Sequence, residues 1–172
     1  MFDCMELLNV YQVVDGHAVP RDGAVAYLYE LLKEREQEAT INISHYKLPT
    51  FKSHVKFVES LPYVHWHLIV HEGIWVGYIS ATHRNEIGVI LAKAHRGKGF
   101  GPMAIQQFIA KHEPLFAMPS ERSGHWLANI NPENHHSQHV FEKLGFKKIQ
   151  STYALIPEEE ARGKGKEASS KG

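Results

Sequence analysis

Residues 86–112 read EIGVILAKAHRGKGFGPMAIQQFIAKH and place a glycine-rich turn between an apolar run and a helical pattern. Residues 86–92 are nearly all apolar, which predicts a strand in the centre of a sheet. The spacing after the turn predicts a helix from about Pro102 to His112, because proline is tolerated at the start of a helix. The segment therefore predicts a strand, a glycine loop and a helix in succession.

The glycine loop has the features of an anion site. Gly97, Gly99 and Gly101 permit positive φ angles and let a ligand approach the backbone closely. The free N–H groups of a helix start attract anions, and Arg96 and Lys98 add positive charge. A pyrophosphate is the natural ligand of such a loop.

Two common nucleotide-binding loops do not fit this spacing. A Walker A loop needs Ser or Thr directly after its lysine, and Gly99 follows Lys98. A dinucleotide fingerprint needs G-x-G-x-x-G, whereas these three glycines alternate with single residues. Both classes are therefore excluded on spacing.

The flanking sequence predicts further strands and helices around this unit. Apolar alternation and helical periodicity distinguish the two types, and Gly145 is a predicted helix C-cap. The expected strands are 5–14, 65–71, 74–82, 125–130, 146–150 and 152–156, the last two being either two short strands or one bent strand. The expected helices are 24–37, 51–60 and 134–144. A hairpin turn is expected at 72–73 and another turn at 82–85.

Composition restricts the class of protein. The 172 residues are 43% hydrophobic and 22% charged, which is ordinary for one globular domain. Lys plus Arg (19) balance Asp plus Glu (19), so nucleic acid is not the expected main partner. The lone Cys4, the lack of a long apolar run and the N-terminal sequence favour a cytoplasmic protein without a membrane span or signal peptide. We expect a domain over residues 1–157 and a disordered charged tail over 158–172.

A second motif lies near the C-terminus. Residues 131–137 read NPENHHS and residues 141–146 read FEKLGF. Together with the loop Arg96–Gly101, which matches [RQ]-x-x-G-x-[GA], they resemble the GNAT superfamily of acyl-CoA-dependent N-acyltransferases. The two motifs occur in that family's order and span about residues 64–156. The variant is similar to the branch that includes ribosomal-protein and sugar-amine acetyltransferases.

The resemblance implies a fold and a set of binding residues. The implied fold is α/β (α+β), with a mixed, mostly antiparallel sheet of six to seven strands flanked by about four helices. Main-chain groups of one strand would pair with the pantetheine arm of acetyl-CoA, and the loop amides would bind its pyrophosphate. Further contacts would come from the late helix, with Asn134 and Ser137 near the thioester end or the pantetheine arm and with Phe141 and Lys143 on the adenine side. The implied set is Val89, Ile90, Leu91, Arg96, Gly97, Lys98, Gly99, Phe100, Gly101, Asn134, Ser137, Phe141 and Lys143.

The chemistry needs a proton acceptor, because a protonated amine has no lone pair with which to attack a thioester. Glu86 is the candidate base or amine anchor, and an exposed strand-start carboxylate is the alternative interpretation. His83 is a second candidate base on the substrate side. Many family members carry a Tyr acid where this chain has Phe141, so Ser137, His139 or solvent are the remaining candidates for the acid.

Histidine pairs raise the question of a metal. His65 and His67 share one strand face, and His135 and His139 are one helical turn apart. No Cys or acidic partner completes either pair, so we expect no metal.

The expected function is therefore acetyl transfer from acetyl-CoA to a primary amine of a small molecule, an amino sugar or similar, by direct attack. A protein N-terminal or lysine acetyltransferase and a non-catalytic CoA-binding module are the alternatives. The expected assembly is a monomer or a homodimer without membrane or nucleic acid.

Overall fold

A four-stranded antiparallel sheet runs through the computed structural model, which describes residues 5–38 and 48–155. The strand order is β1-β4-β5-β6. The strands are β1 (Met5–Asn9), β4 (His65–His71), β5 (Ile74–Ala81) and β6 (Ile87–Leu91). A separate two-stranded sheet joins β2 (Tyr11–Val14) to β3 (His17–Pro20).

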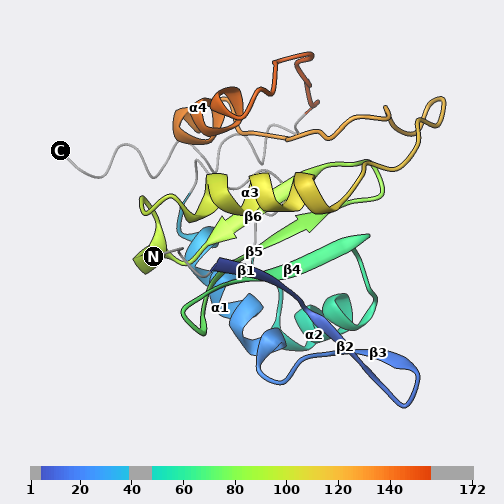
Figure 1. The fold of residues 1–172 in the computed structure, drawn as a ribbon, viewed down its shortest axis with the longest axis vertical. Helices are drawn as coiled ribbons and strands as arrows, with labels where there is room; N and C mark the ends of the chain where they lie inside the picture. Colours follow the sequence, from blue (N-terminus) through green and yellow to red (C-terminus); the bar gives the residue numbers. More distant parts are fainter. Residues whose placement is uncertain (1–4, 39–47, 156–172) are drawn as a thin grey trace.

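Helices cover both faces of the sheet (Figure 1). Helices α1 (Ala24–Glu36) and α2 (Phe51–Glu59) lie on one face, and α3 (Phe100–Lys111) lies on the other. A short 3₁₀ helix, Lys93–His95, precedes α3. Helix α4 (His135–Lys143) lies beyond α3, at the top of the view. The glycine loop and β6 are thus on the α3 side of the molecule.

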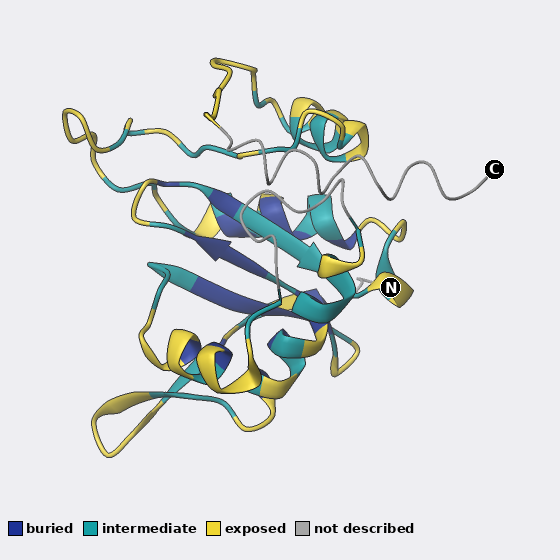
Figure 2. Ribbon diagram, turned by 180° about the vertical axis from the view of Figure 1, so that it is seen from behind, coloured by how far each residue is buried: buried dark blue, intermediate teal, exposed yellow. Residues whose placement is uncertain are grey.

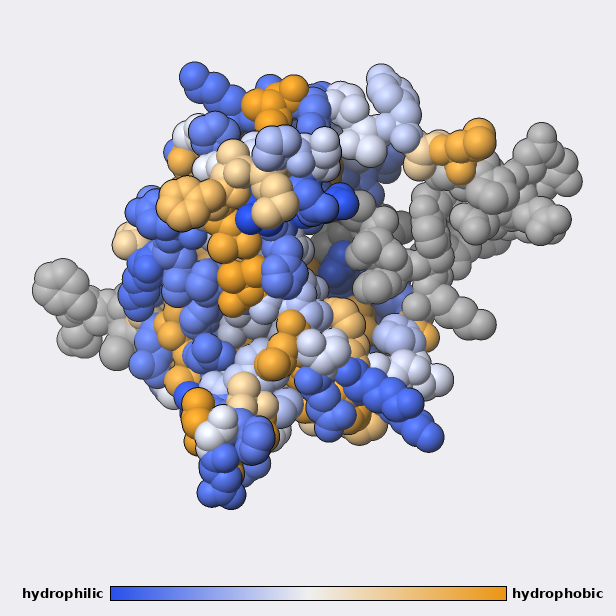
Figure 3. All heavy atoms as spheres, turned by 90° about the vertical axis from the view of Figure 1, so that its right-hand side faces the viewer, coloured by the Kyte–Doolittle hydropathy of each residue, from blue (hydrophilic) through white to orange (hydrophobic). Residues whose placement is uncertain are grey.

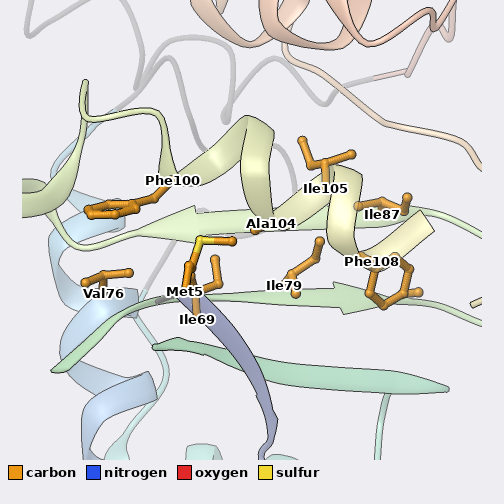
Figure 4. Packing of buried hydrophobic residues seen from close by; sticks show 10 residues of the cluster. Met5, Ile69, Val76, Ile79, Ile87, Phe100, Ala104, Ile105 and Phe108 are labelled. Atoms are coloured by element: carbon orange, nitrogen blue, oxygen red, sulfur yellow. The ribbon is translucent and has the colours of Figure 1, made fainter. Parts of the chain in front are cut away.

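Two clusters of buried apolar residues hold these layers together. The first joins the sheet to α3 and includes Ile69, Ile79 and Phe108 (Figure 4). The second joins the sheet to α1 and α2 and includes Leu28, Val58, Trp66 and Leu68. Because side chains alternate along a strand, successive residues of β4 and β5 enter opposite clusters.

The ends of α4 follow familiar capping chemistry. The Asn134 carboxamide oxygen accepts a hydrogen bond from the Ser137 N–H at 3.1 Å. At the other end Gly145 has φ 90° and donates to the Glu142 carbonyl, while Phe146 donates to the Phe141 carbonyl. These bonds form a Schellman motif, and the Phe141 and Phe146 rings contact each other at 5.0 Å. The predicted glycine cap is confirmed.

Most of the predicted elements are present within one or two residues. The helices predicted at 24–37 and 51–60 are α1 and α2, and Thr50 caps α2 by accepting from the Ser53 N–H. The strands predicted at 65–71 and 74–82 are β4 and β5. The turn before β6 is closed by a hydrogen bond from the Asn85 N–H to the Thr82 carbonyl.

The prediction of one N-terminal strand over 5–14 is wrong. The segment forms β1 and β2, which belong to different sheets and are separated at Val10. Val10 is fully buried, and its N–H donates to the Trp66 carbonyl. The apolar pattern continues through the break because Val10 is itself a buried apolar residue between two strands that both contain apolar residues, so periodicity could not reveal the break.

The predicted sheet of six to seven strands is not confirmed, and β6 is an edge strand of its sheet rather than a central one. Residues 125–130 make only one parallel bridge, Glu86 to Leu127, and no strand forms over 146–150 or 152–155. Apolar alternation shows that a segment could lie on a sheet, but a strand also needs an available partner edge. Ile149 is 71% exposed and has no such partner among the described residues.

Residues 113–134 and α4 contribute no buried residue (Figure 2). Hydrophobic residues also reach the surface between hydrophilic ones on the face seen in Figure 3. None of the helices in the described residues has the length and apolar character needed to cross a membrane. Cys4, the predicted tail 158–172 and Ile156 lie outside the described residues.

Gly77 allows the close approach of β5 and β6. A Cβ atom at Gly77 would lie 2.2 Å from the Ile90 carbonyl oxygen and 2.9 Å from the Leu91 Cα. We expect Gly77→Ala to lower the free energy of unfolding by about 3 kcal/mol, because backbone must move to admit the methyl group. Chemical denaturation measures this change. Gly101→Ala is the matched control, since its Cβ would make an ordinary 3.7 Å contact with Leu91, and equal destabilisation by both variants would contradict the explanation.

Candidate active site

Among the described residues, the outer edge of β6 beyond Ile87 has no partner strand, and of its outward main-chain groups only the Leu91 carbonyl has a partner, the Arg96 guanidinium. The Thr82 N–H donates to the Glu86 carbonyl, and the Ala92 N–H donates to the Val76 carbonyl. Hydrogen-bonding direction alternates along a strand, so residues 86, 88, 90 and 92 direct their main chain toward β5. Val89 and Leu91 therefore direct theirs outward, whereas Ile90 is paired with Tyr78 of β5. Of the three residues predicted to pair with an extended ligand, only Val89 and Leu91 have the required orientation.

The start of this edge is fixed by Asn85, which sequence reasoning treated only as part of a turn. Asn85 is fully buried and has φ 63°. Its side-chain NH₂ donates to the Leu115 and Ser123 carbonyls at 2.9 Å, and its oxygen accepts from the Leu115 N–H at 2.8 Å. The Leu127 N–H donates to the Asn85 carbonyl, and the Ile87 N–H donates to the Leu127 carbonyl. Asn85 thus fastens residues 115–127 beside the first residue of β6.

Helix α3 begins two residues earlier than predicted. The helix begins at Phe100 with Gly99 as its N-cap, so Pro102 is its third residue instead of its first. Proline is tolerated there because the N–H groups of a first turn have no helical partner. Gly97 and Gly99 have φ angles of 73° and 86°, and a Cβ atom at either would meet nothing within 4 Å.

The amides of this loop are available to a ligand. No side chain caps α3, and no acidic residue lies in its first turn. Within the described residues, the N–H groups of Gly97, Lys98, Gly99, Phe100 and Gly101 make no hydrogen bond. Together with the partial positive charge of the helix start, they can bind an anion.

The side chains of the loop have different roles from its amides. The Arg96 guanidinium donates to the Leu91 carbonyl at 3.0 Å and to the Glu38 carboxylate at 2.6 and 2.7 Å. These bonds brace the loop against β6, so Arg96 already has a carboxylate partner. Lys98 is exposed, and the buried Phe100 ring belongs to the core, leaving only its main chain for a ligand.

Glu86 lies half-buried at the beginning of β6, and its carboxylate accepts a hydrogen bond from the Thr82 hydroxyl at 3.0 Å. Even-numbered residues of β6 share a face with Tyr78 and Ser80 of β5, which is the α1 and α2 face. The carboxylate is therefore positioned on the face opposite α3. His83 is exposed in the preceding turn, and its carbonyl accepts from Arg122 at 3.4 Å.

The residues predicted on the late helix are less closely associated with the loop. The Asn134 side chain caps α4, and Ser137 supplies the capped N–H. Phe141 packs against the α3-side core, and Lys143 and His139 are exposed. In the described structure no hydrogen bond, ion pair or ring contact joins Asn134, Ser137, Phe141 or Lys143 to the glycine loop.

Three histidines gather on the α3 face of β4. The His65 and His112 rings lie 4.1 Å apart, and His67 and His112 lie 5.2 Å apart. Burial, together with the nearby His112, His65 and Lys111, lowers the pKa of His67 to about 4. Burial also lowers the pKa of His65 and His112. Over residues 5–38 and 48–155, no group of three or more His, Cys, Asp or Glu side chains could hold a metal ion.

Comparison with known proteins gives a consistent family. A model of the acetyltransferase (GNAT) domain matches residues 20–147. The fold is similar to that of a ribosomal-protein-alanine N-acetyltransferase from Brucella melitensis, with a TM-score of 0.57, 20% identity, and coverage of 73% of this chain and 80% of that one. No curated protein sequence matches the chain.

Two further structures show the same fold. Mutant forms of the spermidine/spermine N-acetyltransferase from Vibrio cholerae give a TM-score of 0.59 at 16% identity, covering 89% of this chain and 86% of that one. The yncA protein of Salmonella typhimurium, solved with acetyl-CoA, gives 0.58 at 17% identity, covering 86% and 82%. The TM-scores show a shared fold at these low identities. The acceptors named for these proteins differ from one another.

The depressed pKa of His67 makes stability depend on pH. The unfolded chain takes up this proton near pH 6.5 and the folded chain near pH 4. The contribution of the neutral His67 side chain to the free energy of unfolding is therefore complete above pH 6.5 and is lost as the pH falls toward 4. We expect His67→Leu to reduce the loss of unfolding free energy between pH 7 and pH 4 by on the order of 3 kcal/mol.

Denaturation at several pH values measures this difference. His17→Asn, at an exposed position of β3, is the control and should keep the parental pH dependence. If the free energy of unfolding of His67→Leu changed with pH as steeply as that of the parental protein, His67 would not be buried in its neutral form.

Proposed function

Because this chain belongs to the family of acetyltransferase (GNAT) domains, we propose that it moves an acetyl group from acetyl-CoA to the primary amine of a small molecule, an amino sugar or similar. One observation carries the proposal. Within the described part of the chain, the edge of β6 without a partner strand runs directly into a loop whose five consecutive amides have no hydrogen-bond partner. An extended amide-containing arm that ends in a pyrophosphate fits this succession.

In this proposal acetyl-CoA lies along the outer edge of β6. Main-chain groups of Val89 and Leu91 pair with the pantetheine arm as a further strand would. The amides from Gly97 to Gly101 bind the pyrophosphate, and Lys98 adds an exposed positive charge. Asn134 and Ser137 are proposed at the thioester end, with Phe141 and Lys143 on the adenine side, on the strength of the family motif.

The acceptor amine approaches from the face that carries Glu86. The carboxylate takes a proton from the ammonium group, directly or through a water molecule, and frees the nitrogen lone pair. The nitrogen attacks the thioester carbon, and an outward N–H of β6 stabilises the oxyanion. The carbon–sulfur bond then breaks, the nitrogen loses its second proton as the amide forms, and the departing CoA thiolate acquires that proton directly or through water. His83 and Ser137 are the further candidates for proton transfer.

Binding of the co-substrate tests the loop. We expect acetyl-CoA to raise the melting temperature, since a ligand at one hundred times its Kd stabilises the folded state by about 2.7 kcal/mol. We expect Lys98→Ala to weaken this binding roughly fivefold, more at low salt than at high salt, because the charge is exposed. Calorimetric titration measures the Kd. Lys52→Ala, an exposed lysine of α2, is the control, and an unchanged melting temperature at saturating acetyl-CoA would refute the proposed loop function.

Turnover tests the base. Glu86→Gln retains an acceptor for the Thr82 hydroxyl but cannot take a proton, so kcat at neutral pH should fall roughly a hundredfold while the Kd of acetyl-CoA stays unchanged. Release of free CoA thiol with a panel of amines measures kcat, and Glu59→Gln on α2 is the control. A parental rate at every pH would exclude Glu86 as the base. Parental binding without thiol release from any amine would favour a non-catalytic CoA-binding module, and acetylation restricted to peptides would favour a protein acetyltransferase.

A further inference from the structure

A cavity of about 190 Å³ lies between α1, α2 and the sheet, on the Glu86 face. Its lining combines the polar residues Arg35, Ser53 and His54 with four aromatic side chains. We call this space the aromatic cavity. The aromatic walls are Phe57, Tyr63, Trp66 and Tyr78. Ser53 and Phe57 are exposed at its rim, so it can be reached from solvent.

Two buried hydrogen-bond donors of this lining have no acceptor among the described residues. They are the Arg35 Nε and Trp66 Nε1 atoms, although the Arg35 side chain also hydrogen-bonds the Tyr78 side chain. Both groups are donors only, so what each lacks is an acceptor. Buried donors without acceptors are rare in folded proteins and call for an explanation. Neither atom is exposed to solvent, so a ligand that brings acceptor atoms into the cavity would complete them once the surrounding side chains shift.

The charge of the lining defines that ligand further. The His54 ring donates to the Val25 carbonyl, and burial lowers the pKa of His54, which keeps it neutral at pH 7. Burial also raises the pKa of Tyr63, which keeps the phenol uncharged. Arg35 is then the only charged group among the residues that line the cavity. A cation would meet its repulsion, whereas a monoanion would be neutralised.

The shape of the site favours a carboxylate on an apolar body. The Trp66 ring has edge contacts with Tyr63 at 4.8 Å and with Tyr78 at 5.8 Å, so the walls are rigid and apolar. A planar carboxylate can accept from a guanidinium and a second donor at once. The remainder of the ligand would lie against aromatic rings.

The cavity is connected to the proposed reaction site through the sheet. Trp66 pairs with Ser80, and Ser80 pairs with Gly88, two residues from Glu86. All of these positions face α1 and α2. Strand spacing and rise place the Trp66 and Glu86 backbones on the order of 10 Å apart. One small molecule could therefore reach both.

We propose that the aromatic cavity binds a carboxylate of the acceptor, so that the substrate is a primary amine joined through an apolar linker to a carboxylate. This inference rests on the proposed acetyl transfer and narrows its acceptor. An amino sugar then fits only if it is acidic, and a polyamine does not fit.

The test compares amines that differ only at their far end. With the parental enzyme, ε-aminocaproate should show a kcat/KM roughly tenfold or more above those of hexylamine, its carboxamide analogue and hexane diamine. Arg35→Gln and Trp66→Phe should each remove most of this preference by raising the KM for ε-aminocaproate. Lys33→Gln, which removes an exposed cation from the same helix, should preserve the preference. Equal kcat/KM values for the four amines, or a preference that survives Arg35→Gln, would overturn the proposal.

A binding measurement separates this inference from the proposed reaction. Hexanoate, which has no amine, should raise the melting temperature of the parental protein and change its tryptophan fluorescence, and both effects should be lost in Arg35→Gln. Hexanoate binding without thiol release from any amine would support the cavity and refute acetyl transfer. Thiol release without hexanoate binding would leave acetyl transfer intact and overturn the cavity proposal.

Discussion

The buried Asn85 side chain limits how far the outer edge of β6 is covered. Its three hydrogen bonds hold residues 115 and 123 against the start of the strand, and its carbonyl holds Leu127. After that single bridge, no described segment pairs with β6 on this side. Had residues 125–130 continued as a parallel strand in the register of that bridge, they would have occupied the outward N–H of Val89. The edge of β6 beyond Ile87 has no partner strand in the described structure because the pairing with residues 125–130 ends at Leu127.

The loop after β6 presents its backbone amides to a ligand because the Arg96 and Phe100 side chains are engaged elsewhere. Arg96 is held by Glu38 and by the Leu91 carbonyl, and Phe100 is in the core. These two residues fix the loop from both ends and leave the intervening amides unpaired. Gly97 and Gly99 adopt left-handed backbone angles that would strain other residues. Rigid, unpaired amides form an anion site with little conformational entropy left to lose on binding.

The sheet separates the two halves of the proposed reaction. Odd-numbered residues of β6 pack against the α3-side core, and even-numbered residues face α1 and α2. The outward main-chain groups lie at the edge between these faces. The co-substrate can therefore bind at the edge while the acceptor binds on the α1 and α2 face, beside Glu86 and the aromatic cavity. Family membership accounts for the first half of the proposed reaction, and the second rests on the residues that line the cavity.

The sequence alone determined the elements with strong local signals, namely α1, α2, the β4–β5 hairpin, the glycine loop and the Gly145 cap. Those signals reside in spacing, capping residues and backbone freedom, which neighbouring residues settle among themselves. Tertiary structure alone decided the split at Val10, the edge position of β6 and the absence of strands over residues 125–155, because pairing depends on which edges remain open. It also decided that Arg35, Trp66 and Tyr78, which come from three different elements, surround one cavity. No local pattern could predict their proximity, since each reads separately as an ordinary helix or core residue.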